Sequence, residues 1–164
     1  MSAKKPGLKM SDLYFKKAQD AESNGRYKKA FSIYLRGIRN GEFGCELNLG
    51  YCYDNGIGVR KNKKKAAFHY KKCSDRGEFS GAANLALVYR KHGKERLAEK
   101  YLQIALDLGD SDAALDLAKI SLKKGDVEKA GKYLDIVVGS RWDEVTPSAR
   151  DEAVDMLRLF SAIL

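Results

Sequence analysis

The chain has 164 residues, which suits one domain or a short array of repeats and leaves little room for two independent cores. Hydrophobic residues make up 44% and charged residues 32%, with 15 glycines against two prolines, so the composition excludes a disordered or collagen-like chain. Lys and Arg number 31 against 22 Asp and Glu, and the net charge of +9 predicts an anionic partner.

The sequence contains neither a membrane span nor a signal peptide. No stretch approaches the roughly 18 apolar residues that cross a bilayer. Residues 1–9 contain Lys4, Lys5 and Lys9 and no apolar core, so we expect a flexible tail there. Three cysteines are too few for a disulfide framework and favour reduced thiols. We therefore expect a cytoplasmic protein with no membrane partner.

One short sequence motif recurs four times along the chain. It occurs as Gly25–Ala30, Gly93–Ala98 and Gly125–Ala130, and in a longer version as Val59–Ala66. Its alanines lie 36, 32 and 32 residues apart. A small residue precedes each motif, and a tyrosine follows it, at position 34, 70, 101 or 133. Repeats of this length are typical of paired helices that stack.

In chain order, the repeats predict helical hairpins over residues 10–43, 44–79, 80–110 and 111–140. The small residues Ala18, Gly50, Ala86 and Ala118 let the two helices of a hairpin cross closely. Thr146 and Pro147 then start a capping helix over residues 146–164. The expected fold is all-α: an α-solenoid of about four antiparallel hairpins and a capping helix, forming a single domain over residues 10–164 and a monomer.

The second repeat has a more specific pattern than the others. It combines Leu49-Gly50, Tyr53, Gly56-x-Gly58-Val59, Asn62, Lys65-Ala66, Tyr70 and Gly77. This pattern resembles the Sel-like repeat, a relative of the tetratricopeptide repeat in which the Gly-x-Gly-Val turn lengthens the connection between the helices. The other repeats are closer to ordinary tetratricopeptide hairpins. The resemblance implies a protein that holds other proteins.

Two specialised versions of the family are not reproduced in this sequence. A secreted branch bridges successive repeats through cysteines, and the partner positions of Cys45 and Cys73 are occupied here by Gly37 and Gly81. Relatives that bind chaperone tails use lysines where this chain has Phe15 and Ser80. The resemblance therefore implies neither the disulfide bridges nor a chaperone-tail receptor.

The resemblance also implies a concave groove lined by the first helix of each hairpin. Asn48 and Asn84 stand two residues before the small positions, where an amide can bond the backbone of a bound chain. Local packing or capping is the alternative for both. We define the predicted groove as Gln19, Asn48, Tyr51, Asn84, Leu87, Arg90, Lys91 and Lys119.

A second candidate surface is strongly basic and lies in the first two repeats. Cations in the first turn of a helix oppose its dipole at a cost of roughly 0.3–1 kcal/mol each, whereas the fourth repeat has Asp126 and Glu128 at that place. We interpret the cations as a surface that steers an acidic partner, with a solvated face as the alternative. This basic edge consists of Arg26, Lys28, Lys29, Arg60, Lys61, Lys63, Lys64 and Lys65.

No combination of residues predicts catalysis, a cofactor or a metal. His69 and Cys73 are four residues apart, and Cys45 and Cys52 seven, but this spacing fits packed core or groove residues better than a metal site. We therefore predict a non-enzymatic module, an adaptor or an inhibitor of the immunity type, that holds an acidic protein or peptide. The alternative is a nucleic-acid binder that uses the basic edge with Tyr27, Phe31 and Tyr34.

Overall fold

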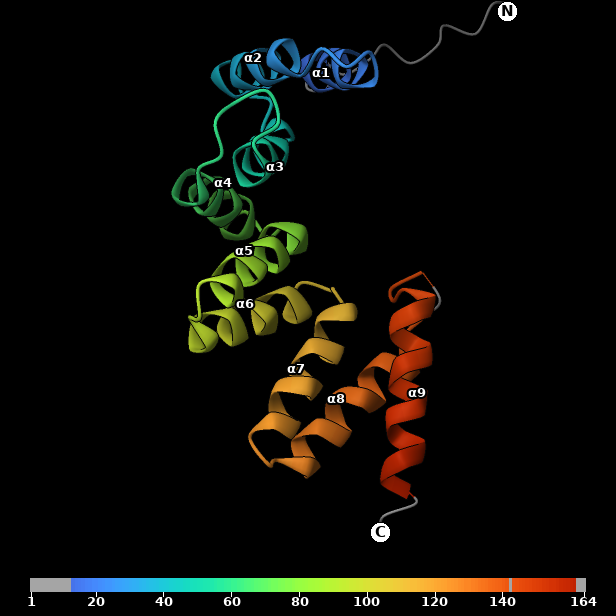
Figure 1. Ribbon diagram of the computed structural model, residues 1–164. Coiled ribbons are helices and arrows are strands. Elements are labelled where there is room, and N and C mark those ends of the chain that lie inside the picture. The colour runs from blue at the N-terminus through green and yellow to red at the C-terminus, as the bar shows by residue number, and fades with distance from the viewer. Residues whose placement is uncertain (1–12, 142, 162–164) are drawn as a thin grey trace, which may run out of the picture. The chain divides into compact units, whose positions relative to one another are not determined.

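The computed structural model describes residues 13–141 and 143–161, with side chains as far as Leu159. Over these residues the chain forms nine α-helices and no strand (Figure 1). The predicted all-α class of helical hairpins is confirmed. The tail predicted for residues 1–9 lies outside the described residues, and the boundaries of the repeat units and of the single domain stay predictions.

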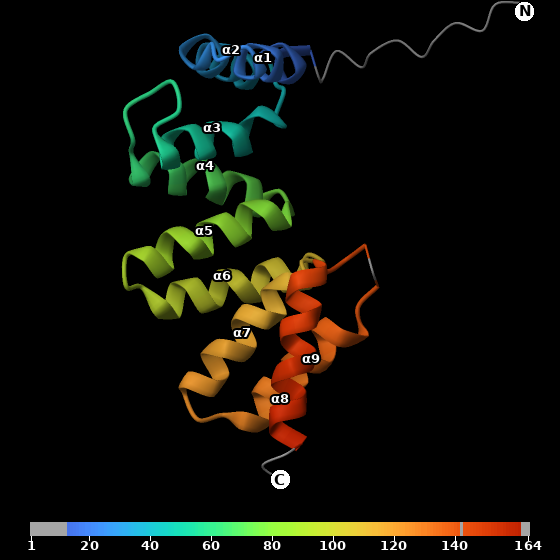
Figure 2. The same ribbon diagram turned by 45° about the vertical axis from the view of Figure 1, so that its right-hand side comes forward.

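Residues 1–72 form a compact unit, called unit 1. Its helices are α1 (Leu13–Ser23), α2 (Tyr27–Arg39), α3 (Cys45–Asn55) and most of α4 (Lys63–Asp75). Helices α1 and α2 lie side by side, and α3 packs against α2 (Figures 1 and 2). One buried hydrophobic cluster of unit 1 contains Ala18, Ala21, Ala30, Tyr34, Cys45, Leu49 and Cys52.

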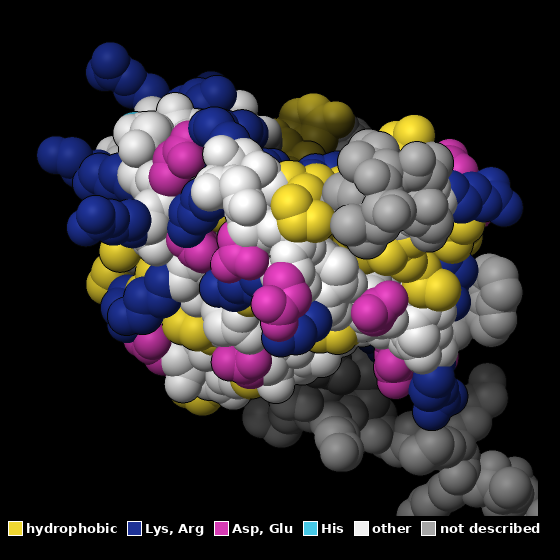
Figure 3. Space-filling model, turned by 90° about the horizontal axis from the view of Figure 1, so that it is seen from below, with side chains coloured by type: hydrophobic (Ala, Val, Ile, Leu, Met, Phe, Trp, Pro, Cys, Tyr) yellow, Lys and Arg dark blue, Asp and Glu magenta, His cyan; other side chains and the backbone are white. Residues whose placement is uncertain are grey.

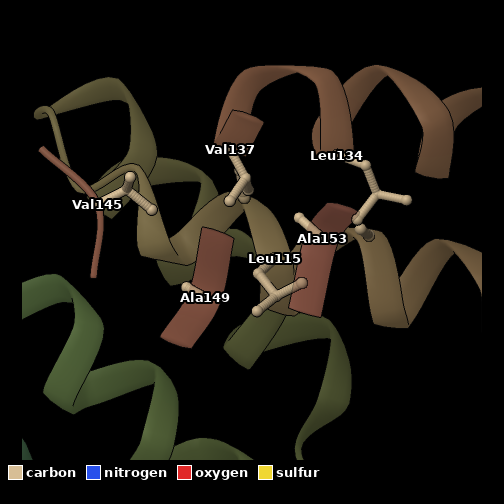
Figure 4. Packing of buried hydrophobic residues seen from close by; sticks show 8 residues of the cluster. Leu115, Leu134, Val137, Val145, Ala149 and Ala153 are labelled. Carbon is tan, nitrogen blue, oxygen red and sulfur yellow. The ribbon is translucent and has the colours of Figure 1, made fainter. Parts of the chain in front are cut away.

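Residues 73–164 form a second compact unit, called unit 2. Helix α5 pairs with α6, α7 pairs with α8, and α9 packs on α8 and α7 (Figure 2). Buried residues of α7, α8 and α9 form one hydrophobic cluster (Figure 4). Val145, in the segment that connects α8 to α9, belongs to the same cluster. The helices of unit 2 are α5 (Phe79–Lys91), α6 (Glu95–Asp107), α7 (Asp112–Lys123), α8 (Val127–Gly139) and α9 (Pro147–Ser161).

Small residues allow the helices of a hairpin to approach closely, as the repeats predict. The recurring alanines at positions 30, 66, 98 and 130 are all fully or almost fully buried. At Gly50 on α3, an added Cβ would lie 2.6 Å from ring atoms of Tyr70 on α4. A larger residue at position 50 would therefore displace the tyrosine that fills the hairpin.

The recurring motif that begins with glycine forms the turn between the two helices of a hairpin. At Gly93 the backbone has φ +68°, and the N–H of Lys94 donates to the carbonyl of Tyr89 at 3.0 Å while that of Gly93 donates to Arg90 at 3.0 Å. This pattern is a Schellman motif, in which a left-handed glycine ends a helix and satisfies its last carbonyls. The turns before Arg26 and Asp126 have the same pair of bonds.

The connection between α3 and α4 is longer and packs against another hairpin. Figures 1 and 2 show this loop rising toward α2. An added Cβ on Gly58 would lie 2.2 Å from the carbonyl oxygen of Tyr27 and 3.0 Å from the amide nitrogen of Lys28. Gly58 also has φ +68°, so both its conformation and its contact with α2 require a residue without a side chain.

Helix starts are capped both locally and from a distance. Thr146 accepts a hydrogen bond from the N–H of Ala149 at 3.3 Å, as the sequence predicts, and Asn62 accepts one from the N–H of Lys65 at 3.0 Å. The N-terminus of α1 is capped by Glu42, whose buried carboxylate accepts from the N–H groups of Tyr14 and Phe15. This last contact joins the loop after α2 to α1 within unit 1.

We expect Gly58→Ala to destabilise unit 1 more than Gly93→Ala destabilises unit 2. Both glycines have φ +68°, but an added Cβ at Gly93 meets no atom within 4 Å. The backbone strain of roughly 1–3 kcal/mol is common to both variants, and the overlap with α2 adds about 1–3 kcal/mol for Gly58→Ala alone. Urea unfolding of the two variants measures the difference, and equal losses would contradict the contact.

Candidate functional site

The basic edge is assembled within unit 1 from two segments that are far apart in the sequence. Because Gly58 lies on the start of α2, residues 26–29 lie beside the α3–α4 connection that continues into residues 60–65. A hollow of about 520 Å³ lies at this contact, lined by residues 25–29 and Gly58. A second hollow, of about 390 Å³, starts at the next residue, Val59, and is lined by residues 59–62, Tyr53 and Lys65.

Most cations of the basic edge lack a carboxylate partner. Lys63 is the exception, because its half-buried ammonium pairs with Asp54 on α3. Lys65 lies over the ring of Tyr53, with its Nζ 5.1 Å from the ring centroid. Among the described residues, no carboxylate forms an ion pair with the six other members, which are all exposed: Arg26, Lys28, Lys29, Arg60, Lys61 and Lys64.

The helix starts differ in the way that the charge pattern predicts. Asp126 accepts from the N–H of Lys129 at 3.0 Å and so caps α8 with a favourable negative charge. Helix α2 starts after Arg26, whose side chain makes no capping bond. The cations at α2 are therefore not placed there to stabilise the helix.

Cations of unit 2 are paired with carboxylates far more often than those of unit 1. Residues 1–72 hold 17 Lys and Arg against 6 Asp and Glu, whereas residues 73–164 hold 14 against 16. Figure 3 looks onto the lower ends of α7, α8 and α9, where Asp and Glu side chains lie among Lys and Arg. Pairs within unit 2 join Arg90 to Asp116, Lys119 to Glu152, Lys123 to Glu95 and Lys124 to Glu99.

Part of the predicted groove is brought together in unit 2. The guanidinium of Arg90 on α5 lies 2.9 Å from the carboxylate of Asp116 on α7, so the first helices of two hairpins share one face. Arg90 and Lys119 line a hollow of about 180 Å³ with Ala98 and Ile120. Leu87 and Lys91 are also exposed on α5. In unit 1, Gln19 and Tyr51 are exposed and Asn48 is half-buried.

The two groove asparagines differ in their hydrogen bonding. The amide of Asn84 donates to the carbonyl of Ser80 on its own helix at 2.8 Å, which is the local alternative. No hydrogen bond of the Asn48 side chain is found among the described residues. Asn48 therefore has its amide available for a bound chain, whereas Asn84 uses one donor on α5.

The aromatic residues of α2 do not form a stacking surface. Tyr34 is fully buried, and Phe31 is half-buried with its ring edge against Tyr53, 5.3 Å between centroids. Tyr27 is half-exposed beside the basic edge. One exposed ring offers much less than the successive aromatic platforms on which single-stranded nucleic acids stack.

His69 belongs to a buried polar cluster between α3 and α4. Its Nδ1 lies 2.9 Å from the carboxylate of Glu46, a side chain with no exposed surface. The Lys72 ammonium lies 3.4 Å from the same oxygen, and the ring of Tyr53 stacks on that of His69. No group of three or more His, Cys, Asp or Glu side chains able to hold a metal ion occurs in the described part of the chain.

Several residues beside the basic edge carry no signal that distinguishes them in the sequence. Lys17 and Asp20 on α1, Asn24 in the turn after α1 and Ile33 on α2 line a hollow of about 210 Å³ together with Arg26 and Lys29. The spacing of Lys17, Asp20 and Asn24 places them on one helical face, which is the only hint available before the fold is known.

None of the helices in the described residues is long and apolar enough to cross a membrane.

The Sel1 repeat family profile matches residues 45–78, which cover α3 and α4, and residues 81–110, which cover α5 and α6. Two segments of the chain thus match the Sel1 repeat. The first of them is the segment with the Gly-x-Gly-Val turn, and the second lacks that turn in its sequence. Sel1 repeats are generally non-catalytic modules of protein–protein interaction. No curated protein matches the sequence.

Solved Sel1 structures have the same fold. A Sel1 repeat protein from Oxalobacter formigenes is 20% identical over 77% of this chain and 56% of its own, with a TM-score of 0.67. The protective antigen c5321 of uropathogenic Escherichia coli is 21% identical over 77% of this chain and 32% of its own, with a TM-score of 0.62. The chain thus spans about half and about a third of their lengths.

A further similar structure is the immunity protein Pa5087 of Pseudomonas aeruginosa, which is 18% identical. The match covers 80% of this chain and 66% of that protein, with a TM-score of 0.40. This score is too low to support a conclusion about the present chain.

We expect Glu46 and His69 to stabilise unit 1 cooperatively. Removing one partner of a buried pair leaves the other polar group without compensation. The variants Glu46→Leu, His69→Leu and their combination should give a coupling free energy of about 0.5–3 kcal/mol in urea unfolding. The exposed pair Glu128 and Lys132 is the control, with a coupling below about 0.5 kcal/mol. Additive losses for Glu46 and His69 would show that their contact contributes nothing.

The buried thiols of Cys45 and Cys52 should make the protein less stable at high pH. Burial, with nearby glutamates, raises the pKa of each from 9.0 to about 11. The unfolded chain therefore loses these protons first. Stability is unaffected below about pH 9 and falls as the pH rises toward 11, by about 1 kcal/mol per thiol at about pH 10. Thermal unfolding should show this fall in the wild type and a smaller one in Cys45→Ala/Cys52→Ala. Identical pH profiles would refute it.

Proposed function

We propose that the protein is a binding module that captures an acidic protein partner on the basic edge of unit 1. The observation that supports this most strongly is the group of six exposed cations without carboxylate partners, assembled around the contact between Gly58 and α2. A surface kept only for solubility mixes both signs of charge, as unit 2 does.

The cations also stand where they are unfavourable for the isolated fold. At the start of α2 they oppose the helix dipole, and the like charges within residues 60–65, which are neighbours in the sequence, repel one another. An acidic partner would relieve both effects. Exposed charges of this kind mainly raise the association rate and select partners of opposite charge, while apolar and aromatic contacts supply the remaining affinity.

The groove is a second surface for the same partner. In unit 2 it offers an apolar floor at Ala98 and Ile120 and charged side chains that are already paired. Such a surface supplies shape and hydrogen bonds and adds little attraction for net negative charge. An adaptor or an inhibitor would use these surfaces in the same way.

A nucleic-acid partner is the alternative for the basic edge, because phosphates are attracted by the same cations. The burial of Tyr34 and the packing of Phe31 count against it, since they remove two of the three rings that could stack on bases. The two partners differ in a simple measurement. Binding to nucleic acid without sequence preference is strong at low salt and falls steeply as salt rises.

The test reverses three cations of the α3–α4 connection and the start of α4. Arg60→Glu, Lys61→Glu and Lys64→Glu leave the pairs of Lys63 and Lys65 intact, so the fold should be preserved. Affinity capture from an extract of the source cells should retain a protein with the wild type and lose it at least about tenfold with the triple variant.

The control reverses three exposed cations of unit 2, Lys94→Glu, Arg96→Glu and Lys100→Glu, and should capture as the wild type does. Capture that is equal for the two triple variants and the wild type would refute the basic edge. Tight binding of random RNA or DNA at physiological salt, lost in the Arg60, Lys61 and Lys64 variant, would assign the surface to nucleic acid.

A further inference from the structure

Two hollows of unit 1 join at the start of α2, and a third lies further along the α3–α4 connection. The hollow between α1 and α2 shares Arg26 and Lys29 with the hollow at Gly58. The third hollow, beside Tyr53, shares no residue with the other two, but its lining begins at Val59, the residue after Gly58. We call the combined surface the basic track.

Each part of the track combines cations with apolar surface. The first hollow has Lys17 together with Ala21 and Ile33. The middle hollow has Arg26 and Lys28 beside the half-exposed ring of Tyr27. The last hollow has Arg60, Lys61 and Lys65 with Val59 and Tyr53. Asp20 is the only carboxylate among the lining residues of the three hollows.

We propose that the basic track binds an extended acidic segment of the protein partner, in which carboxylate and apolar side chains both contact the surface. This inference rests on the proposed function and specifies which part of the partner is held. A folded acidic surface would meet the exposed cations but leave the hollows unfilled. An extended chain directs every second side chain to the same side, about 7 Å apart, and so can fill separate small hollows in succession.

Lys17 is a new member of the site under this proposal. It lies on α1, outside the basic edge, and lines the first hollow with Arg26 and Lys29. It is exposed and has no ion pair among the described residues. If the partner were bound only at the start of α2 and the α3–α4 loop, Lys17 would contribute little beyond screened long-range attraction.

Unit 2 provides a matched control for the track. Lys94 and Arg96 stand at the start of α6 as Arg26 and Lys28 stand at the start of α2, and all four are exposed. Neither Arg26 nor Lys94 caps its helix with its side chain. The turn glycines Gly25 and Gly93 both have open space around them, but at the start of α2 the backbone of Tyr27 lies against Gly58 of the α3–α4 connection. Changing Arg26 and Lys28 to Glu, or Lys94 and Arg96 to Glu, therefore makes the same change of charge. Only the first pair lies in the basic track.

The experiment measures fluorescence anisotropy of a labelled decapeptide of repeated Glu-Glu-Leu-Leu, called the Glu-Leu peptide, with the full chain at about 50 mM and 150 mM NaCl. In its extended form this peptide presents Glu and Leu in turn on each side. We expect saturable binding that weakens at least about fivefold in Lys17→Glu and in Arg26→Glu/Lys28→Glu, and changes less than about twofold in Lys94→Glu/Arg96→Glu. A decapeptide of repeated Lys-Lys-Leu-Leu should not bind. Circular dichroism and urea unfolding confirm that each variant is folded.

Two results would overturn the proposal. One is failure of the Glu-Leu peptide to bind, or equal binding by wild type and the Lys17 and Arg26/Lys28 variants. The other is binding of a glutamate decamer as tightly as the Glu-Leu peptide, because it would show charge attraction without use of the apolar hollows. If the partner protein is nevertheless lost with Arg60, Lys61 and Lys64 reversed, the proposed function stands and only the extended segment is refuted.

Discussion

Close crossing of the two helices in each hairpin is the constraint on which the structure depends. Gly50 lets the ring of Tyr70 lie where a Cβ would be, and the alanines at positions 30, 66, 98 and 130 are buried at the equivalent places of the second helices. Close axial approach lets short helices of 11 to 13 residues bury enough surface to be stable, although helices of that length are marginal alone. The exposed faces are then free to carry charge and binding residues.

A second close approach, of Gly58 to the backbone of Tyr27, turns two charged segments into one surface. Without it the α3–α4 connection would be an ordinary loop and residues 26–29 would face solvent alone. The insertion that distinguishes this Sel1 repeat from a short hairpin turn thus has a consequence for chemistry as well as for the fold. It encloses hollows that mix apolar floors with cations, which exposed lysines on a flat helix face do not provide.

The two units use charge in different ways. In unit 2, ion pairs join neighbouring helices, such as Arg90 to Asp116 and Lys124 to Glu99. Exposed pairs of this kind contribute little stability each, but they neutralise the surface and limit long-range attraction. In unit 1, carboxylates are withdrawn into structural roles: Glu42 caps α1, Glu46 is buried against His69, and Asp54 holds Lys63. The exposed surface of unit 1 is left with an excess of positive charge.

The sequence alone was sufficient for the helical class, the hairpins, the Sel1 resemblance, the helix start at Thr146 and the favourable charge of Asp126 at the start of α8. These features depend on spacing and on residues within one or two turns of each other, so they can be read along the chain. Tertiary structure was needed to show that Gly58 rests on α2, that Lys63 is neutralised while Arg60 is not, and that Lys17 borders the same hollow as Arg26. Those facts depend on contacts between residues that no periodicity relates, because a loop's path is set by what it packs against.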